Sequence, residues 1–183
     1  MIATEKGQRP VEDLVRGDRV VTRDNGLKRI MWVGQRRFSY QEMSLNDAPT
    51  PIIVRAGAFG EGNPRRDMIV SPQHRFLVGP RVSPLMGGKD EALISARHLI
   101  DGNRVMHVDM LGVNYLHLLC NAHEVILANG CWTESFHPDD ELIRDIAPMQ
   151  RREILALFPE IETIGAARRF SPARPIRKSR FDG

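Results

Sequence analysis

The chain has 183 residues, of which 42% are hydrophobic and 27% are charged, a composition typical of a globular protein long enough to bury a core. No apolar run approaches the roughly 20 residues that a membrane-spanning helix needs, and no N-terminal block resembles a signal peptide. We therefore expect a soluble protein with no membrane partner, and the sequence leaves its compartment open.

The basic residues are unevenly distributed. The formal net charge is +3, but residues 165–183 hold six Lys or Arg against one acid, which leaves about −2 for residues 1–164. The body is therefore not a basic domain, and we do not expect it to bind nucleic acid. The basic tail could contact an acidic partner, or it could be a solvated and mobile terminus.

Cys120 and Cys131 are the only cysteines. They provide neither a disulfide framework nor a Cys-x-x-Cys metal spacing. They could pair with each other, but we interpret both as small hydrophobic residues. His98 and His107 add no known metal-ligand spacing and are interpreted as structural. The sequence thus predicts no metal site and no cofactor.

The first half of the chain is predicted to form short strands separated by turns. Residues 18–23 and 28–33 flank the turn sequence DNG, a pattern that predicts a β-hairpin. Further short apolar runs predict strands at residues 51–55, 67–70 and 75–78. A loop rich in Gly and Pro is expected over residues 79–89.

The second half continues the strand pattern. It contains an apolar run, an expected helical turn and a loop turn at residues 91–94, 96–99 and 101–103. Three candidate strands follow at residues 105–119, 123–127 and 131–136, and the tight-turn pair Asn129-Gly130 joins the last two. Many short strands at close spacing indicate an all-β body.

The pattern changes after His137. Apolar residues recur at helical spacing in residues 141–146 and again in residues 148–158. Pro148 suits the first turn of the second helix, and Pro159 can end it. We therefore divide the chain into a β domain at residues 1–136 and a helical extension with a basic tail at residues 137–183, loosely ordered from residue 168.

The segment SPQH, from Ser71 to His74, places a hydroxyl three residues before an imidazole. Such a pair can hydrogen-bond or protonate a strained peptide bond and so lower the barrier to nucleophilic attack. A Ser-Pro turn followed by a histidine that caps the next strand also explains the segment. These four residues alone leave both interpretations open.

Three segments in chain order carry a family resemblance: GQRPVEDL with GDRV at residues 7–20, SPQHR at residues 71–75, and HEVILANG at residues 123–130. Together they resemble the Hint domain of hedgehog autoprocessing domains and inteins, most closely its bacterial type, over residues 2–136. The resemblance implies an all-β, horseshoe-like fold with pseudo-two-fold symmetry and a short C-terminal helical extension.

The resemblance also implies self-processing of the polypeptide. In such domains a first-position Cys or Ser attacks the preceding carbonyl and converts an amide to a thioester or ester. His74 matches the family histidine that assists this acyl shift, and Ser71 stands where many members have Thr. His117 lies near a position that assists the later step, although a buried structural histidine is an equal alternative. The implied partner is the upstream segment of the same polypeptide, with no activity in trans.

The sequence departs from the family pattern at both ends of the domain. Members usually begin with a Cys and a Gly-Thr turn, whereas Met1 precedes the matching segment here, and a thioether forms no acyl intermediate. We expect either a fragment or a member that lost its chemistry, inactive as given. The stretch TESF at residues 133–136 replaces the terminal His-Asn of inteins, so splicing is not expected. The alternative function is a non-catalytic β module for binding or structure.

Overall fold

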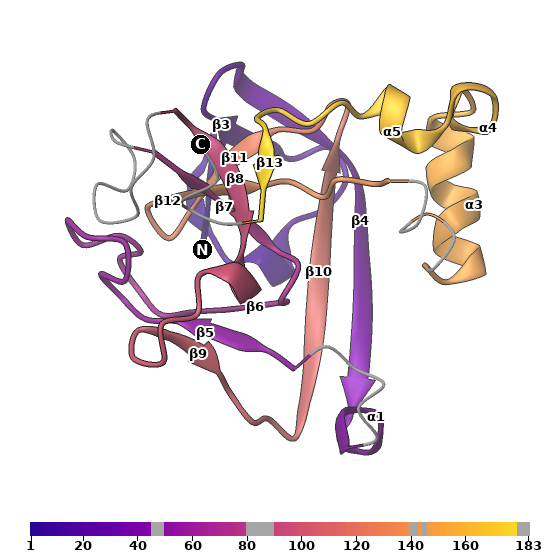
Figure 1. Ribbon diagram of the computed structural model, residues 1–183. Helices are drawn as coiled ribbons and strands as arrows, with labels where there is room; N and C mark the ends of the chain where they lie inside the picture. The colour runs from indigo at the N-terminus through magenta and orange to yellow at the C-terminus, as the bar shows by residue number, and fades with distance from the viewer. Residues whose placement is uncertain (45–49, 80–89, 140–142, 144–145, 179–183) are drawn as a thin grey trace.

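The computed structural model describes residues 1–44, 50–79, 90–139, 143 and 146–178, and strands dominate it (Figure 1). The strands are β1 (Ile2–Thr4), β2 (Gly7–Arg9), β3 (Arg19–Thr22), β4 (Gly26–Ser39), β5 (Ile52–Val54), β6 (Met68–Val70), β7 (Arg75–Val78), β8 (Ala92–Ser95), β9 (Val105–His107), β10 (Gly112–Cys120), β11 (Val125–Ala128), β12 (Cys131–Glu134) and β13 (Ile176–Arg177). The helices are α1 (Tyr40–Ser44), α3 (Pro148–Leu157), α4 (Ile161–Ile164) and α5 (Ala166–Arg169), with 3-10 turns at Val11–Asp13 and Ala96–His98.

Two sheets organise these strands. A ten-stranded sheet has the order β10-β4-β3-β1-β11-β12-β7-β8-β13, with β2 beside β1, and it curls into a half-barrel. A three-stranded sheet has the order β6-β5-β9. The predicted all-β class is confirmed. No helix within the described parts of the chain is long and apolar enough to cross a bilayer.

Strands β4 and β10 form a long arm that stands out from the rest of the sheet (Figure 1). They pair from Gly112 opposite Ser39 to Leu119 opposite Trp32, with an irregularity before Cys120. The predicted hairpin strand ended at residue 33, but β4 continues to Ser39. The outer half of β4 is held extended by its pairing with β10 and is not buried on both faces. A continuous apolar pattern is therefore not required there, and the sequence shows none.

The hairpin of β11 and β12 confirms the predicted tight turn. Asn129 and Gly130 both have left-handed backbones, with φ of 48° and 83°, and they link Ala128 directly to Cys131. A two-residue turn with two positive φ angles matches the twist of the strands, and Asn and Gly tolerate these angles best. The Asn129 amide donates to the Met1 carbonyl at 2.8 Å, so the first residue lies beside this turn.

The C-terminal helices pack on one end of the arm around a separate core. This core combines Trp32 and Leu119 of the arm with the fully buried Ile154 and Phe170 of the extension. Helix α3 runs over the predicted residues and begins at Pro148, which confirms that prediction. Helices α4 and α5 were not predicted. Most of the predicted helix at residues 141–146, and all but residue 79 of the expected loop, lie outside the described residues.

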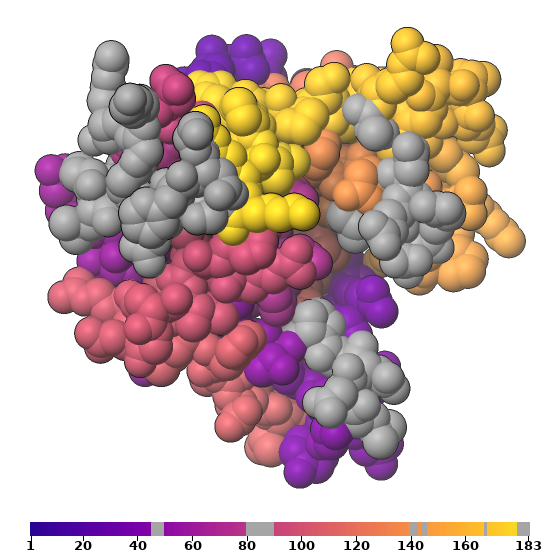
Figure 2. All heavy atoms as spheres, in the orientation of Figure 1, coloured from indigo at the N-terminus to yellow at the C-terminus, as the bar shows by residue number. Residues whose placement is uncertain are grey.

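The basic tail was predicted to be loosely ordered, and this prediction is wrong for the residues described up to Lys178. Residues 170–178, which we call the C-terminal strap, run from the helices back across the strands and end in β13 (Figures 1 and 2). Strand β13 pairs in parallel with β8, with Ile176 opposite Leu93. The tail is ordered because distant elements supply its partners, which no local sequence pattern reveals.

Candidate functional site

His74 lies in the turn that leads into β7. The His74 amide donates to the Ser71 carbonyl at 3.1 Å, which closes the turn, and the His74 carbonyl accepts the Ala96 amide at 2.8 Å. The turn is therefore fixed on one side by its own backbone and on the other by the residue that follows β8. The backbone of His74 is thus held by hydrogen bonds, and the imidazole is the part of the residue that can take part in a reaction.

The partner of His74 is Thr133 on the neighbouring strand β12. The His74 Nε2 contacts the Thr133 Oγ1, and the same hydroxyl donates its only proton to the Arg75 carbonyl at 2.8 Å. The Thr133 oxygen must then accept a hydrogen bond from His74, which assigns the Nε2–H tautomer and leaves Nδ1 as a proton acceptor. The arrangement is a neutral imidazole oriented by a buried hydroxyl.

Thr133 is not among the site residues predicted from the sequence. Its strand alternates between buried and partly buried side chains, and Thr133 occupies an inward position directly opposite Phe76. A hydroxyl at an inward strand position was the signal that could have identified it, because a buried hydroxyl requires a hydrogen-bond partner. The sequence gives no indication that the partner is His74, 59 residues earlier.

Burial lowers the pKa of His74, and the Arg75 charge acts in the same direction, against the opposing effect of Glu134. Because the ordinary pKa of histidine is about 6.5, His74 is neutral at pH 7. A neutral imidazole with one nitrogen already donating can accept a proton at the other. The site is thus suited to general-base chemistry followed by return of the proton as a general acid.

The structure places the other two predicted site residues differently. His117 on β10 packs against Phe136, with ring centroids 4.7 Å apart, and the charge of His74 contributes to its electrostatic environment. Ser71 contributes its carbonyl to the turn, and no hydrogen bond between its hydroxyl and His74 is found among the described residues. A catalytic role for any of these side chains stays a prediction.

His117 should make the protein sensitive to acid. Burial, and then the charges of His74 and Arg36, lower its pKa to about 4. Between pH 6.5 and about 4 the unfolded chain protonates this histidine and the folded chain does not, so the free energy of unfolding falls with falling pH, by at most roughly 3 kcal/mol.

Urea unfolding at about pH 7 and about pH 4.5 measures this effect. The loss of stability between the two pH values should be smaller in His117→Leu than in the wild type. The exposed His107 provides the matched control, because His107→Leu should keep the whole loss. An equal loss in His117→Leu and the wild type would contradict the assignment.

Neither cysteine supplies a nucleophile. Both are buried and free, and burial raises the pKa of Cys120 and of Cys131 to about 12. At neutral pH they are thiols, and the reactive species is the thiolate. Their interpretation as small hydrophobic residues is consistent with their places in two of the hydrophobic cores.

The first residue lies beside the tip of the hairpin that carries Thr133. The Met1 carbonyl accepts the Asn129 amide at 2.8 Å, and Thr133 lies on β12, two residues beyond Cys131. Burial lowers the pKa of the Met1 amino group, with Glu12 opposing this effect and Arg66 adding to it. The start of β1 is thus next to the β11–β12 turn, with β11 and β12 between β1 and β7.

The described residues contain no group of three or more His, Cys, Asp or Glu side chains that could hold a metal ion. A cavity of about 450 Å³ lies between residues 57–62 and the turn at residues 101–105. None of His74, His117 and Thr133 lines it. The candidate site thus consists of side chains in the turn before β7 and on β10 and β12, separate from this cavity.

A model of the Hint domain family matches residues 1–140. No curated protein matches the sequence. Among solved structures, the MchDnaB-1 intein is 11% identical with a TM-score of 0.46, over 74% of this chain and 95% of that chain. The AceL NrdHF class 3 split intein is 14% identical with a TM-score of 0.44, over 73% and 92%, and the gp41-1 intein is 12% identical with a TM-score of 0.39, over 72% and 91%.

Proposed function

The chain belongs to the Hint domain family, and from that premise we propose that it is a self-processing domain that acts on a peptide bond of its own upstream segment. The observation that carries the proposal is the neutral His74, oriented by Thr133 with its Nδ1 left to accept a proton. The substrate is the bond that precedes a Cys or Ser located before β1, because the two cysteines within the described fold are buried thiols.

The reaction is an acyl shift. The sulfur of the upstream Cys attacks the carbonyl carbon of the preceding peptide bond, and its proton passes to His74 Nδ1. The carbon–nitrogen bond then breaks, a thioester forms, and His74 returns the proton to the departing amine nitrogen. A Ser nucleophile gives an ester by the same steps. Attack on the thioester by water or by a small thiol releases the upstream segment.

His117 and Ser71 have secondary roles in this proposal. His117 is a neutral imidazole with a pKa of about 4, so it can accept a proton in the later step but carries no charge at neutral pH. Ser71 provides the turn that presents His74. Two arginines of the basic tail are occupied, since Arg169 pairs with Glu160 and Arg174 pairs with Asp24. These pairs give no support to nucleic-acid binding by the tail.

A designed precursor tests the proposal. A reporter protein is joined to Met1 through about six residues that begin with Cys and end with Gly-Thr, because six extended residues reach about 20 Å. We expect cleavage before the Cys, accelerated by a small thiol, with the products identified by mass spectrometry. The matched control has Ala in place of the added Cys and should stay intact.

An intact Cys precursor in thiol, with the domain shown to be folded, would reject the proposal. That outcome would favour a non-catalytic β module.

A further inference from the structure

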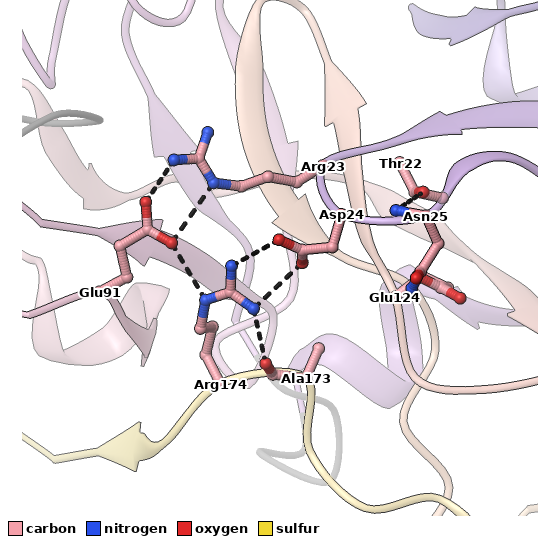
Figure 3. A network of polar contacts seen from close by, with 8 residues as sticks. All are labelled: Thr22, Arg23, Asp24, Asn25, Glu91, Glu124, Ala173 and Arg174. Atoms are coloured by element: carbon pink, nitrogen blue, oxygen red, sulfur yellow. Dashed lines mark hydrogen bonds and ion pairs between the residues drawn. The ribbon is translucent and has the colours of Figure 1, made fainter.

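The C-terminal strap is held to the strands by charged and polar contacts. The Arg174 guanidinium binds the Asp24 carboxylate at 2.7 and 3.0 Å and the Glu91 carboxylate at 3.0 Å. Arg23 contacts the same Glu91 from its other side, so one carboxylate lies between two guanidinium groups (Figure 3). The strap is therefore fastened to the loop after β3 and to the residue before β8.

Two buried histidines form hydrogen bonds with the backbone of the strap. The His137 Nε2 donates to the Phe170 carbonyl at 2.6 Å, and the His123 Nδ1 accepts the Ala173 amide at 3.2 Å. Their rings stack with centroids 4.3 Å apart. Because Nδ1 of His123 is an acceptor, its proton must be on Nε2. The bond from Ala173 therefore fits the neutral tautomer of His123 that carries its proton on Nε2.

The other side of His123 faces the candidate site. Its Nε2 lies 3.4 Å from the Glu134 Oε2, and the His123 side chain is fully buried. The two oxygens of Glu134 accept the Arg75 amide and the Arg75 guanidinium, both at 2.9 Å. Arg75 follows His74 in the chain, and Glu134 follows Thr133. The Arg75–Glu134 pair therefore lies directly beside the His74–Thr133 pair.

We propose that His123 and Glu134 are positioning residues that couple docking of the C-terminal strap to the geometry of His74 and Thr133. The inference rests on the proposed function, since it makes the strap a working part of the self-processing site. Neither positioning residue touches the reacting atoms. They act through the backbone of Arg75 and through the electric field at the imidazole of His74.

The physical basis is the position of the His123 ring beside a buried carboxylate. The Nε2–H of His123 makes an electrostatic contact with Glu134 rather than a hydrogen bond, and the carboxylate, which is 10% exposed, accepts its two hydrogen bonds from Arg75. If the strap leaves, Nδ1 of His123 loses the Ala173 amide and water can reach the ring, which is then no longer held beside Glu134. The negative charge of Glu134 is then less well compensated beside His74.

The charged and titratable groups that face His74 define the expected change. They are Glu134 on β12, Arg75 on β7 and His117 on β10. A less compensated Glu134 stabilises the imidazolium form of His74, and water that reaches the site acts in the same direction. Release of the strap should therefore raise the pKa of His74 toward its ordinary value.

The test measures both ends of the coupling in the chain of residues 1–183. Hydrogen exchange at the Ala173 amide reports on the strap, and the imidazole NMR titration reports the pKa of His74. In Arg174→Ala we expect exchange at Ala173 to accelerate at least about tenfold and the pKa of His74 to rise by about 0.5 units. Arg177→Ala is the matched control, because it removes a strap charge but none of the contacts with Asp24 and Glu91.

A double substitution tests whether the coupling runs through His123. An asparagine amide oxygen can replace Nδ1 as the acceptor for Ala173, but Asn has no group at the position of Nε2. In a His123→Asn background, Arg174→Ala should therefore leave the pKa of His74 unchanged. If Arg174→Ala alone does not release the strap, Ala173→Pro removes the amide donor directly and should give the same rise.

Two results would overturn the inference. One is faster exchange at Ala173 with an unchanged pKa of His74, which would make the strap a passive attachment. The other is a rise of the same size in the His123→Asn background. Neither measurement requires processing, so an intact Cys precursor would reject the proposed function without deciding this coupling. A precursor that cleaves while the coupling is absent would reject the inference alone.

Discussion

Replacing His74 with alanine in the Cys precursor should slow self-cleavage by at least about 100-fold. General acid–base catalysis by a positioned side chain increases a reaction rate roughly 10²–10⁴-fold. Among the described residues, His74 is the histidine whose ring is oriented by Thr133. The rate is measured as the appearance of the released reporter in a small thiol at about pH 7. His107→Ala, at an exposed histidine on β9, should cleave at the wild-type rate.

The pH dependence and a second variant sharpen this prediction. The pKa of His74 is lowered by burial, so the base form should persist to pH values below about 6.5, and the cleavage rate should hold there before it falls. Thr133→Val keeps the volume of the side chain but loses the hydroxyl that orients the ring. It should reduce the rate by less than His74→Ala does. Cleavage by His74→Ala at the wild-type rate would remove His74 from the mechanism.

Gly34→Ala should destabilise the fold by about 3–5 kcal/mol, the cost of losing a buried tryptophan from a core. Gly34 and Trp32 are two residues apart on β4, so they face the same side of the strand. A Cβ on Gly34 would lie 1.9 Å from the Trp32 ring, which must therefore leave. The ring is 5% exposed, and its Nε1 donates to Glu153 at 2.7 Å, so its departure also breaks this hydrogen bond between the arm and α3.

A double-mutant cycle identifies the cause of this loss. Urea unfolding is measured for Gly34→Ala, Trp32→Ala and the double variant. If the clash with the ring is the cause, Gly34→Ala should cost less than about 1 kcal/mol once Trp32 is absent, because alanine itself is tolerated in a strand. A full penalty in the Trp32→Ala background would show that the backbone at Gly34, and not the ring, sets the cost.

The sequence predicted those parts of the fold that depend on neighbouring residues. The hairpin turn at Asn129 and Gly130 and the start of α3 at Pro148 are local, and both are confirmed. The extra length of β4, the partner of Thr133 and the docking of the strap depend on residues far away in the chain. Arg174 and Glu91, for example, are 83 residues apart. Hydrophobic periodicity carries no information about such pairs.

The candidate site was likewise predicted only in part from the sequence. His74 was identified because its segment resembles a family motif, and the structure adds the hydroxyl that orients it. Thr133 belongs to the stretch that departs from the intein ending, and nothing else in the sequence distinguishes it. Its role depends on β12 lying beside β7, which the spacing of the two segments does not specify. The roles of His74, Ser71 and His117 remain predictions that the cleavage experiments test.

The parallel pairing of β13 with β8 can form only after the ribosome has made both strands. At about 5–20 residues per second, roughly 4–17 s separate Glu91 from Arg174 during translation. During that interval Glu91 has only its earlier partner Arg23, so this edge of the sheet is completed several seconds after β8 itself is made.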